Sequence, residues 1–199
     1  MNNRKLLIRI LSIFMLAMIV STHSPVNAEV LKPAEGGMPA LEEENQYDGI
    51  AVRTAQGKNF KIPGRKGTLT SNAWRSTRER SVGNTYQWDY QVSAVYSGNK
   101  KVESIKTSWY GKASLRNSAS INLGLSNSGM TAGASSSWKN ITTPVKYWEN
   151  NNDSKSSDYR SNLIVSPSKD YRSNTISLMN TARVKLKGDP KPYVVSSGV

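Results

Sequence analysis

The sequence predicts an all-β fold, most simply an antiparallel β-sandwich, and three observations lead to this prediction. Apolar side chains occupy every second position in several runs, Gly, Ser and Asn separate these runs, and no helical apolar spacing extends beyond a turn or two. A strand with one apolar face needs a second apolar layer to cover that face. A partly closed β-barrel or an elongated β-meander would satisfy the same pattern.

The first 28 residues have the features of a secretory signal peptide. Arg4, Lys5 and Arg9 precede the apolar run 10–20, and the small-residue motif 26–28 follows it. We therefore expect residues 1–28 to be a signal peptide and the rest of the chain to be secreted into the extracellular space.

Residues 29–48 differ in composition from the chain that follows. Six acidic residues stand against one basic residue, which gives a net charge of −5, and Pro33, Gly36, Gly37 and Pro39 accompany few large apolar side chains. Such a composition seldom packs into a core. We expect an acidic, flexible leader, most simply an unstructured tail; a removable pro-segment or a strap over the basic body is the alternative.

The chain lacks the side chains on which most enzyme and metal chemistry depends. It contains no cysteine, and its only histidine, His23, lies in the predicted signal peptide. Zinc sites and most nucleophile–histidine arrangements are therefore excluded from the chain after residue 28. The carboxylates show no pairing that would suit a glycosidase, and Ser-x-x-Lys occurs only where we expect turns and strands. We expect a non-catalytic protein with no cofactor and no metal site.

We expect a single all-β domain over residues 49–188. Gly and Pro interrupt 53–80, which indicates short strands and turns. Residues 86–96 alternate strictly, and the turn 97–100 leads into a second alternating run, 101–115, so we predict a hairpin. Trp88 and Trp109 fall within the apolar stripes and are expected in the core.

The remaining elements follow from the same alternation. The sequence predicts a hairpin from 118–125 and 130–134, a strand over 141–148, a polar loop at 150–157, and strands over 159–165 and 175–186. Pro144 cannot donate to a ladder, which favours an edge position or a bulge. The last residues, 189–199, contain two prolines and are expected to form a C-terminal tail.

Basic residues are concentrated near the start of the domain. Without residues 1–28 the chain carries 24 Lys and Arg against 14 Asp and Glu, and 53–80 alone holds eight basic residues and one acid. For a secreted protein, this surplus is explained most simply by solubility or general electrostatic adhesion; the alternative is a dedicated anionic partner, such as a cell-envelope polymer, an extracellular polymer or a membrane surface. No nucleic-acid-binding module accompanies it, so nucleic acid is not expected. The candidate anionic-ligand-binding residues are Arg53, Lys58, Lys61, Arg65, Lys66, Arg75, Arg78 and Arg80, with Trp74 as a stacking surface.

An alternative function comes from residues 117–137, which carry no charge and are called the uncharged segment below. Each arm of its predicted hairpin has roughly nine residues, close to the ~9–11 of a tilted membrane-spanning strand. Small polar side chains alternate with apolar ones, as in a barrel pore. The chain would then be a secreted pore-forming toxin or bacteriocin-like protein, and the membrane-inserting residues would be Ala119, Ile121, Leu123, Leu125, Met130, Ala132 and Ala134.

Overall fold

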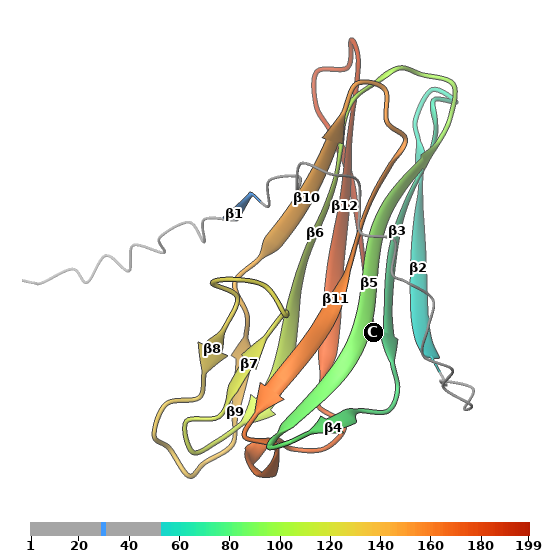
Figure 1. Cartoon of the computed structure of the whole chain (residues 1–199). Coiled ribbons are helices and arrows are strands. Elements are labelled where there is room, and N and C mark those ends of the chain that lie inside the picture. Colours follow the sequence, from blue (N-terminus) through green and yellow to red (C-terminus); the bar gives the residue numbers. More distant parts are fainter. Residues whose placement is uncertain (1–28, 31–52) are drawn as a thin grey trace, which may run out of the picture.

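The computed structural model describes residues 29–30 and 53–199, which form two β-sheets packed face to face along an elongated body (Figure 1). The predicted signal peptide and nearly all of the predicted leader lie outside the described residues. The all-β prediction is confirmed, since a 3-10 turn at Ser168–Asp170 is the sole helical element of the described chain. No helix in these ranges is long and apolar enough to cross a membrane.

The first sheet has six strands. Its order is β1 (Glu29–Val30), β10 (Lys146–Asn151), β6 (Val102–Leu115), β12 (Ser177–Leu186) and β13 (Tyr193–Gly198). The sixth strand, β9 (Lys139–Thr142), pairs with the C-terminal end of β6. All of these pairs are antiparallel except β1 with β10. Pro144 lies in the break between β9 and β10, where its missing N–H removes no ladder bond.

The second sheet has seven strands and curls into a half-barrel (Figure 1). Its order is β2 (Arg53–Ile62), β3 (Gly67–Ser76), β5 (Thr85–Ser97), β11 (Ser156–Ser166), β7 (Ser120–Asn122) and β8 (Met130–Thr131), and β4 (Arg80–Val82) pairs with β5. The long central strands β5 and β11 pair over ten consecutive residues. This sheet therefore has a rigid centre and a short, irregular edge at β7 and β8.

The predicted hairpin between 86–96 and 101–115 is wrong, because β5 and β6 belong to different sheets. Both runs are strands, and the turn between them crosses from one sheet to the other. The link from β10 to β11 crosses in the same way. A strand pattern fixes which side chains face inward but not which strand is the neighbour, so the pairing could not be read from the alternation.

Residues 189–199 are not a tail. β13 pairs with β12 over six residues, and the N–H groups of Val199 and Leu178 each donate to the other residue's main-chain oxygen at 2.9 and 2.6 Å. Val195 and Ser197 face inward and are buried, whereas Val194 and Ser196 are exposed. This alternation covers only a few residues and follows two prolines, which concealed it.

Side chains on the inward faces of β5 and β6 form the core, as predicted. Trp88, Tyr90, Trp109 and Leu115 are at most 1% exposed. The core is divided into two apolar clusters, one around Trp109 and Leu163 and the other around Ile105, Tyr96 and Val184. The two sheets are therefore held together at two levels along the body.

A buried polar layer separates the two clusters. Thr107 Oγ1 donates to Asn180 Oδ1 at 2.6 Å within the six-stranded sheet. Asn180 Nδ2 reaches across to the main-chain oxygens of Asn72 and Ser93, both at 2.8 Å. Ser71 Oγ, from the seven-stranded sheet, lies 3.1 Å from the same nitrogen. A polar side chain at an inward position of β12 thus joins the two sheets directly, and the sequence pattern did not predict it.

Candidate functional site

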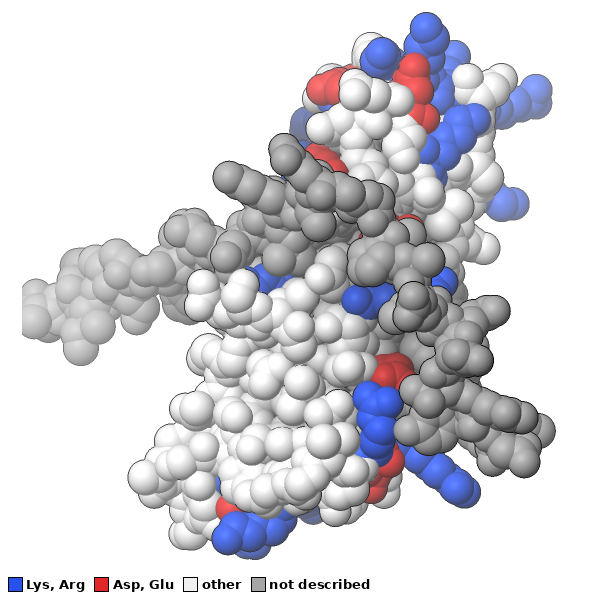
Figure 2. Space-filling model, viewed as in Figure 1, with Lys and Arg blue, Asp and Glu red and all other residues white. Residues whose placement is uncertain are grey.

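Four strand connections meet at one end of the body, here called the cationic end. They are residues 63–66, 98–101, 152–155 and 187–192, which connect β2 to β3, β5 to β6, β10 to β11 and β12 to β13. Together they hold seven basic and two acidic residues. Figure 2 shows Lys and Arg side chains clustered at this end. The basic residues are Arg65, Lys66, Lys100, Lys101, Lys155, Lys187 and Lys191.

Hydrogen bonds fix these connections to one another. Lys155 Nζ donates to the main-chain oxygen of Gly98 at 2.7 Å, and Lys187 N donates to the main-chain oxygen of Lys101 at 2.9 Å. Asp153 N donates to the main-chain oxygen of Val102 at 3.2 Å. The charged groups are consequently carried on a preorganised surface, which lowers the entropy lost when a ligand is bound.

One ion pair at the cationic end is supported by a hydrogen bond from a tyrosine. Lys66 Nζ donates to Asp189 Oδ1, and Tyr193 Oη donates to Asp189 Oδ2 at 2.9 Å. The hydrogen bond from Lys66 lowers the pKa of the Asp189 carboxyl, and the same bond raises the pKa of Lys66. This pair ties the β2–β3 turn to the β12–β13 turn.

Most of the other cations at this end have no carboxylate near them. Lys187 Nζ lies 4.0 Å from Asp153 Oδ1. Within residues 53–199, no carboxylate oxygen lies within 4 Å of the side-chain nitrogens of Arg65, Lys100, Lys101, Lys155 or Lys191. The electrostatic potential of these groups is therefore available to an anionic partner.

The basic residues predicted from 53–80 are not gathered in one place. Arg65 and Lys66 belong to the cationic end, and Lys61 precedes that turn. Lys58 lines a shallow groove between β2 and β13. The remaining basic residues of the stretch, Arg53, Arg75, Arg78 and Arg80, belong to the opposite end of the β2–β3 hairpin or to the chain that follows it. The sequence could not show this division, because it depends on the hairpin placing its turn at one end of the body and the outer ends of both strands at the other.

Arg75 is unsuited to surface binding. Its Nη1 donates to the main-chain oxygen of Ser76 at 3.0 Å, and its Nε is buried without a hydrogen-bond partner. Burial lowers the pKa of this guanidinium. The side chain lies on the inward face of β3, next in the alternation after the buried Ala73.

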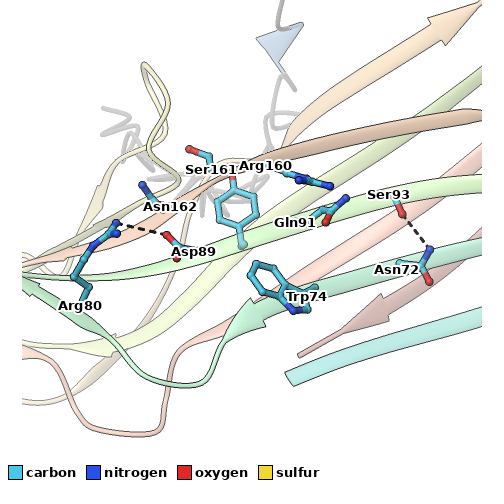
Figure 3. Close-up of a pocket in the computed structure, with 10 residues that line it drawn as sticks. Asn72, Trp74, Arg80, Asp89, Gln91, Ser93, Arg160, Ser161 and Asn162 are labelled. Atoms are coloured by element: carbon cyan, nitrogen blue, oxygen red, sulfur yellow. Dashed lines mark hydrogen bonds and ion pairs between the residues drawn. The ribbon is translucent and has the colours of Figure 1, made fainter. Parts of the chain in front are cut away.

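A second concave feature, here called the outer-face hollow, lies on the solvent side of the seven-stranded sheet and has a volume of about 750 Å³ (Figure 3). It contains Trp74 and Arg80 of the predicted set. Its lining residues are Asn72, Trp74, Arg80, Asp89, Tyr90, Gln91, Ser93, Arg160, Ser161 and Asn162.

The polar side chains of the hollow are ordered by contacts with one another. Arg80 Nη2 lies 3.5 Å from Asp89 Oδ1, and Asn72 Nδ2 donates to Ser93 Oγ at 3.0 Å. The Gln91 carboxamide oxygen accepts from Arg160 Nη2 and Nε at 3.2 and 3.3 Å. The hollow thus combines one indole, two guanidinium groups, one carboxylate and several amides.

The uncharged segment is part of the core in this structure. Ala119, Ile121 and Leu123 are fully buried and Ala132 is 5% exposed, and all four belong to the cluster around Trp109. Leu125 packs against that cluster, whereas Met130 and Ala134 are exposed. Its paired arms, β7 and β8, have three and two residues instead of roughly nine each, because the left-handed residues Ser118, Gly124 and Gly133 interrupt the predicted arms.

The base of the uncharged segment is fastened by Asp170. Its Oδ1 accepts from Arg116 Nε at 3.2 Å and from Asn117 Nδ2 at 2.8 Å. The Arg116 guanidinium in turn lies 4.6 Å from the centroid of the Trp138 ring. These contacts close the segment at both of its ends.

The described residues contain no group of three or more His, Cys, Asp or Glu side chains placed to hold a metal ion. No protein-family model and no curated protein matches this chain.

Proposed function

We propose that this protein is a secreted, non-catalytic β-sandwich that binds phosphate-bearing anionic surfaces of a cell envelope through its cationic end. The observation that carries the proposal is the convergence of seven basic side chains from four separate connections, with two carboxylates among them. Each Lys or Arg held near an anionic surface contributes about 1 kcal/mol, so the group as a whole supplies enough free energy for adhesion.

The proposal predicts binding that weakens with salt and depends on where the charge lies. The test compares the triple variant Lys100→Glu/Lys101→Glu/Lys155→Glu with a matched control, Lys139→Glu/Lys169→Glu/Arg172→Glu. All six side chains are exposed, and each triple changes the net charge by the same amount, but none of the control residues belongs to the cationic end.

Binding is measured by co-sedimentation with vesicles of phosphatidylglycerol, with vesicles of phosphatidylcholine, and with isolated bacterial cell walls. The first triple is expected to weaken binding to an anionic surface by at least about 100-fold at low salt, whereas the control triple changes it little. Retention on phosphatidylglycerol or on walls identifies lipid headgroups or wall polymer as the source of phosphate. Equal losses in the two triples, or retention on phosphatidylcholine alone, contradict the proposal.

Membrane insertion of the uncharged segment is the second candidate function. The observation that favours it is the weak attachment of the segment: β7 pairs with β8 over two residue pairs and with β11 over three. Insertion would require Ile121 and Leu123 to leave the core, so the folded chain would be the form that precedes the pore.

A disulfide lock tests this candidate, because the chain has no cysteine of its own. Asn122 and Ile164 are registered neighbours on β7 and β11, and such neighbours have Cα atoms about 4.5–5.5 Å apart, within the range of a disulfide. If the segment inserts, the wild type releases dye from vesicles, the oxidised Asn122→Cys/Ile164→Cys variant does not, and reduction restores release. No release by the wild type, or equal release from the locked variant, contradicts insertion.

A further inference from the structure

The outer face of the six-stranded sheet carries a row of basic side chains at the end of β12. Arg183, Lys185 and Lys187 alternate with Val184 and Leu186, which are at most 1% exposed, so the basic side chains point outward. Alternate residues of a strand are roughly 6.6 Å apart along it. These three basic residues are called the β12 stripe below. Because Lys187 begins the connection 187–192, the stripe is continuous with the cationic end.

The charges of the β12 stripe are not neutralised by close carboxylates. Within residues 53–199, no carboxylate oxygen lies within 4 Å of the side-chain nitrogens of Arg183 or Lys185. Lys185 Nζ donates to the main-chain oxygen of Asp189, which is an uncharged acceptor. Lys187 Nζ lies 4.0 Å from Asp153 Oδ1. The hydrogen bond of Lys185 therefore fixes its ammonium group without cancelling its charge.

The acidic side chains of this face are fewer than the basic ones. Lys106 is the registered neighbour of Arg183 on β6, and its Nζ is paired with Glu149 Oε2 at 2.8 Å. Glu149 is thereby occupied, and β6 separates its strand from β12. Glu103 is exposed in the β6 bulge opposite Lys185, and it forms no ion pair within the described part of the chain. The stripe thus sets three basic groups against one unpaired acid.

The β12 stripe extends from the cationic end along the flank of the body. Arg183 is four residues before Lys187, and four strand residues extend roughly 13 Å. A planar membrane that touches the four connections lies across the strands, so Arg183 is farther from it than the Debye length of about 8 Å at 0.15 M salt. A flexible polymer can turn from the end onto the flank and contact both. The stripe therefore favours a chain over a planar surface as partner.

We propose that the partner of the cationic end is a flexible, linear phosphodiester polymer that continues along the β12 stripe. This inference rests on the proposed function and names the class of its ligand. Successive phosphates of the polymer contact Lys187, Lys185 and Arg183, and the Arg183 guanidinium binds its phosphate through two parallel N–H groups. Lipid headgroups in a membrane contact the cationic end alone.

The test presents one chemical group in two arrangements to the full chain. The probes are oligo(glycerol phosphate) of three and of twelve repeats, and vesicles of phosphatidylglycerol, whose headgroup is also glycerol phosphate. Oligomer binding is measured by isothermal titration calorimetry and vesicle binding by co-sedimentation, both at about 0.15 M salt. The twelve-repeat oligomer is expected to bind more tightly per phosphate than the three-repeat oligomer. Equal affinity per phosphate overturns the proposal.

The variant Arg183→Gln/Lys185→Gln removes two charges of the stripe, keeps hydrogen-bond donors at both positions and leaves the cationic end unchanged. It should weaken binding of the twelve-repeat oligomer by about 10- to 30-fold and change vesicle binding by less than about threefold. Thermal unfolding shows whether the variant is folded.

The matched control is Lys112→Gln/Lys139→Gln. It removes two exposed charges from the same sheet, and Lys112 is in register with Ser177, six residues or roughly 20 Å from Arg183. Binding of the oligomer and of vesicles should change by less than about threefold. Equal losses of oligomer binding in the two double variants, or a stripe variant that loses vesicle and oligomer binding equally, overturn the proposal.

The Lys100→Glu/Lys101→Glu/Lys155→Glu variant separates this inference from the proposed function, and it should weaken both oligomer and vesicle binding. If it does so while the stripe variant binds the oligomer like the wild type, the polymer path along β12 is wrong and the function of the cationic end stands. If the triple variant binds both probes like the wild type, the proposed function is wrong and this proposal is overturned with it.

Discussion

The side-chain nitrogen of Asn180 lies 2.8 Å from the main-chain oxygen of Asn72, and this contact joins the two sheets at the middle of the sandwich. The same nitrogen also donates to the main-chain oxygen of Ser93, and the Thr107 hydroxyl donates to the carboxamide oxygen of Asn180. A buried polar group that loses its partner retains the cost of its desolvation. The layer is therefore stabilising only while it is complete.

Replacing Asn180 should destabilise the whole domain. Asn180→Ala leaves two main-chain oxygens and the Thr107 hydroxyl short of a partner, so we expect a loss of about 2–4 kcal/mol in the free energy of unfolding. Urea unfolding followed by tryptophan fluorescence measures the change. Asn99→Ala, in an exposed turn, is the matched control and should be within about 0.5 kcal/mol of the wild type. A stable Asn180→Ala variant would show that the layer contributes nothing.

Tyr90 connects the core to the uncharged segment. Its hydroxyl accepts from Trp109 Nε1 at 2.9 Å and donates to the main-chain oxygen of Leu123 at 3.1 Å. Tyr90→Phe should cost about 1–3 kcal/mol because both groups lose their partner. If the segment inserts into membranes, this variant should also release dye faster than the wild type.

Tyr90 also predicts a response to alkali. Burial raises the pKa of its phenol, so the folded chain keeps a proton that the unfolded chain loses above the ordinary tyrosine pKa of about 10. Its contribution to stability is therefore complete below that pH and is lost as the pH rises further. Urea midpoints at pH 8, 10 and 11 should fall less steeply for Tyr90→Phe than for the wild type, and parallel declines would contradict this assignment.

Gly111 marks a close contact between β6 and the elements that cover it. A Cβ at this position would lie 2.5 Å from Leu163 Cδ2, with Ile121 and Leu123 at 3.5 Å. We expect Gly111→Ala to cost about 1–3 kcal/mol through overpacking. Gly129→Ala is the control, since its nearest atom would be 3.8 Å away. Equal thermal midpoints for the two variants would show that the cluster can rearrange around a methyl group.

Asp189 is expected to couple pH to both stability and binding. Lys66 lowers the pKa of the Asp189 carboxyl, so the contribution of Asp189 to the free energy of unfolding is complete above the ordinary pKa of 3.8 and is lost as the pH falls through the lower native pKa. The pKa of Lys66 is raised, so its contribution to the free energy of unfolding is complete below pH 10.5 and is lost as the pH rises further. Asp189→Asn should therefore unfold more easily near pH 7 and show a shallower loss of stability in acid. The variant removes one negative charge from the cationic end and should bind phosphatidylglycerol vesicles more tightly. Weaker binding would contradict the role of net charge there.

Alternation in the sequence was sufficient to predict the inward faces of β5, β6 and β12, including Trp88 and Trp109. It could not predict partners in space: β5 and β6 are consecutive in the chain yet lie in opposite sheets. For the same reason, the sequence did not predict the cationic end, because Arg65, Lys100 and Lys155 lie together there but are far apart in the chain. The outer-face hollow contains Trp74 and Arg80, which composition had singled out, and also Arg160, which enters it only through strand register.

Asn180 was missed by the sequence analysis for a different reason. Its amide occupies an inward position between Leu178 and Ala182, where an apolar residue continues the pattern more naturally. A polar residue at such a position, with Thr107 and Ser71 at inward positions of other strands, is a signal that a sequence reading can use. Recognising it requires knowing that these three strands meet at the same level.

The lengths of β5 and β6, 13 and 14 residues, define the distance between the two extremities of the molecule. At about 3.3 Å per residue, each strand extends roughly 45 Å. If the lysine-rich tip binds an envelope, the long axis of the molecule points away from that surface. Met130 and the neighbouring loops then lie well away from the layer to which the molecule adheres.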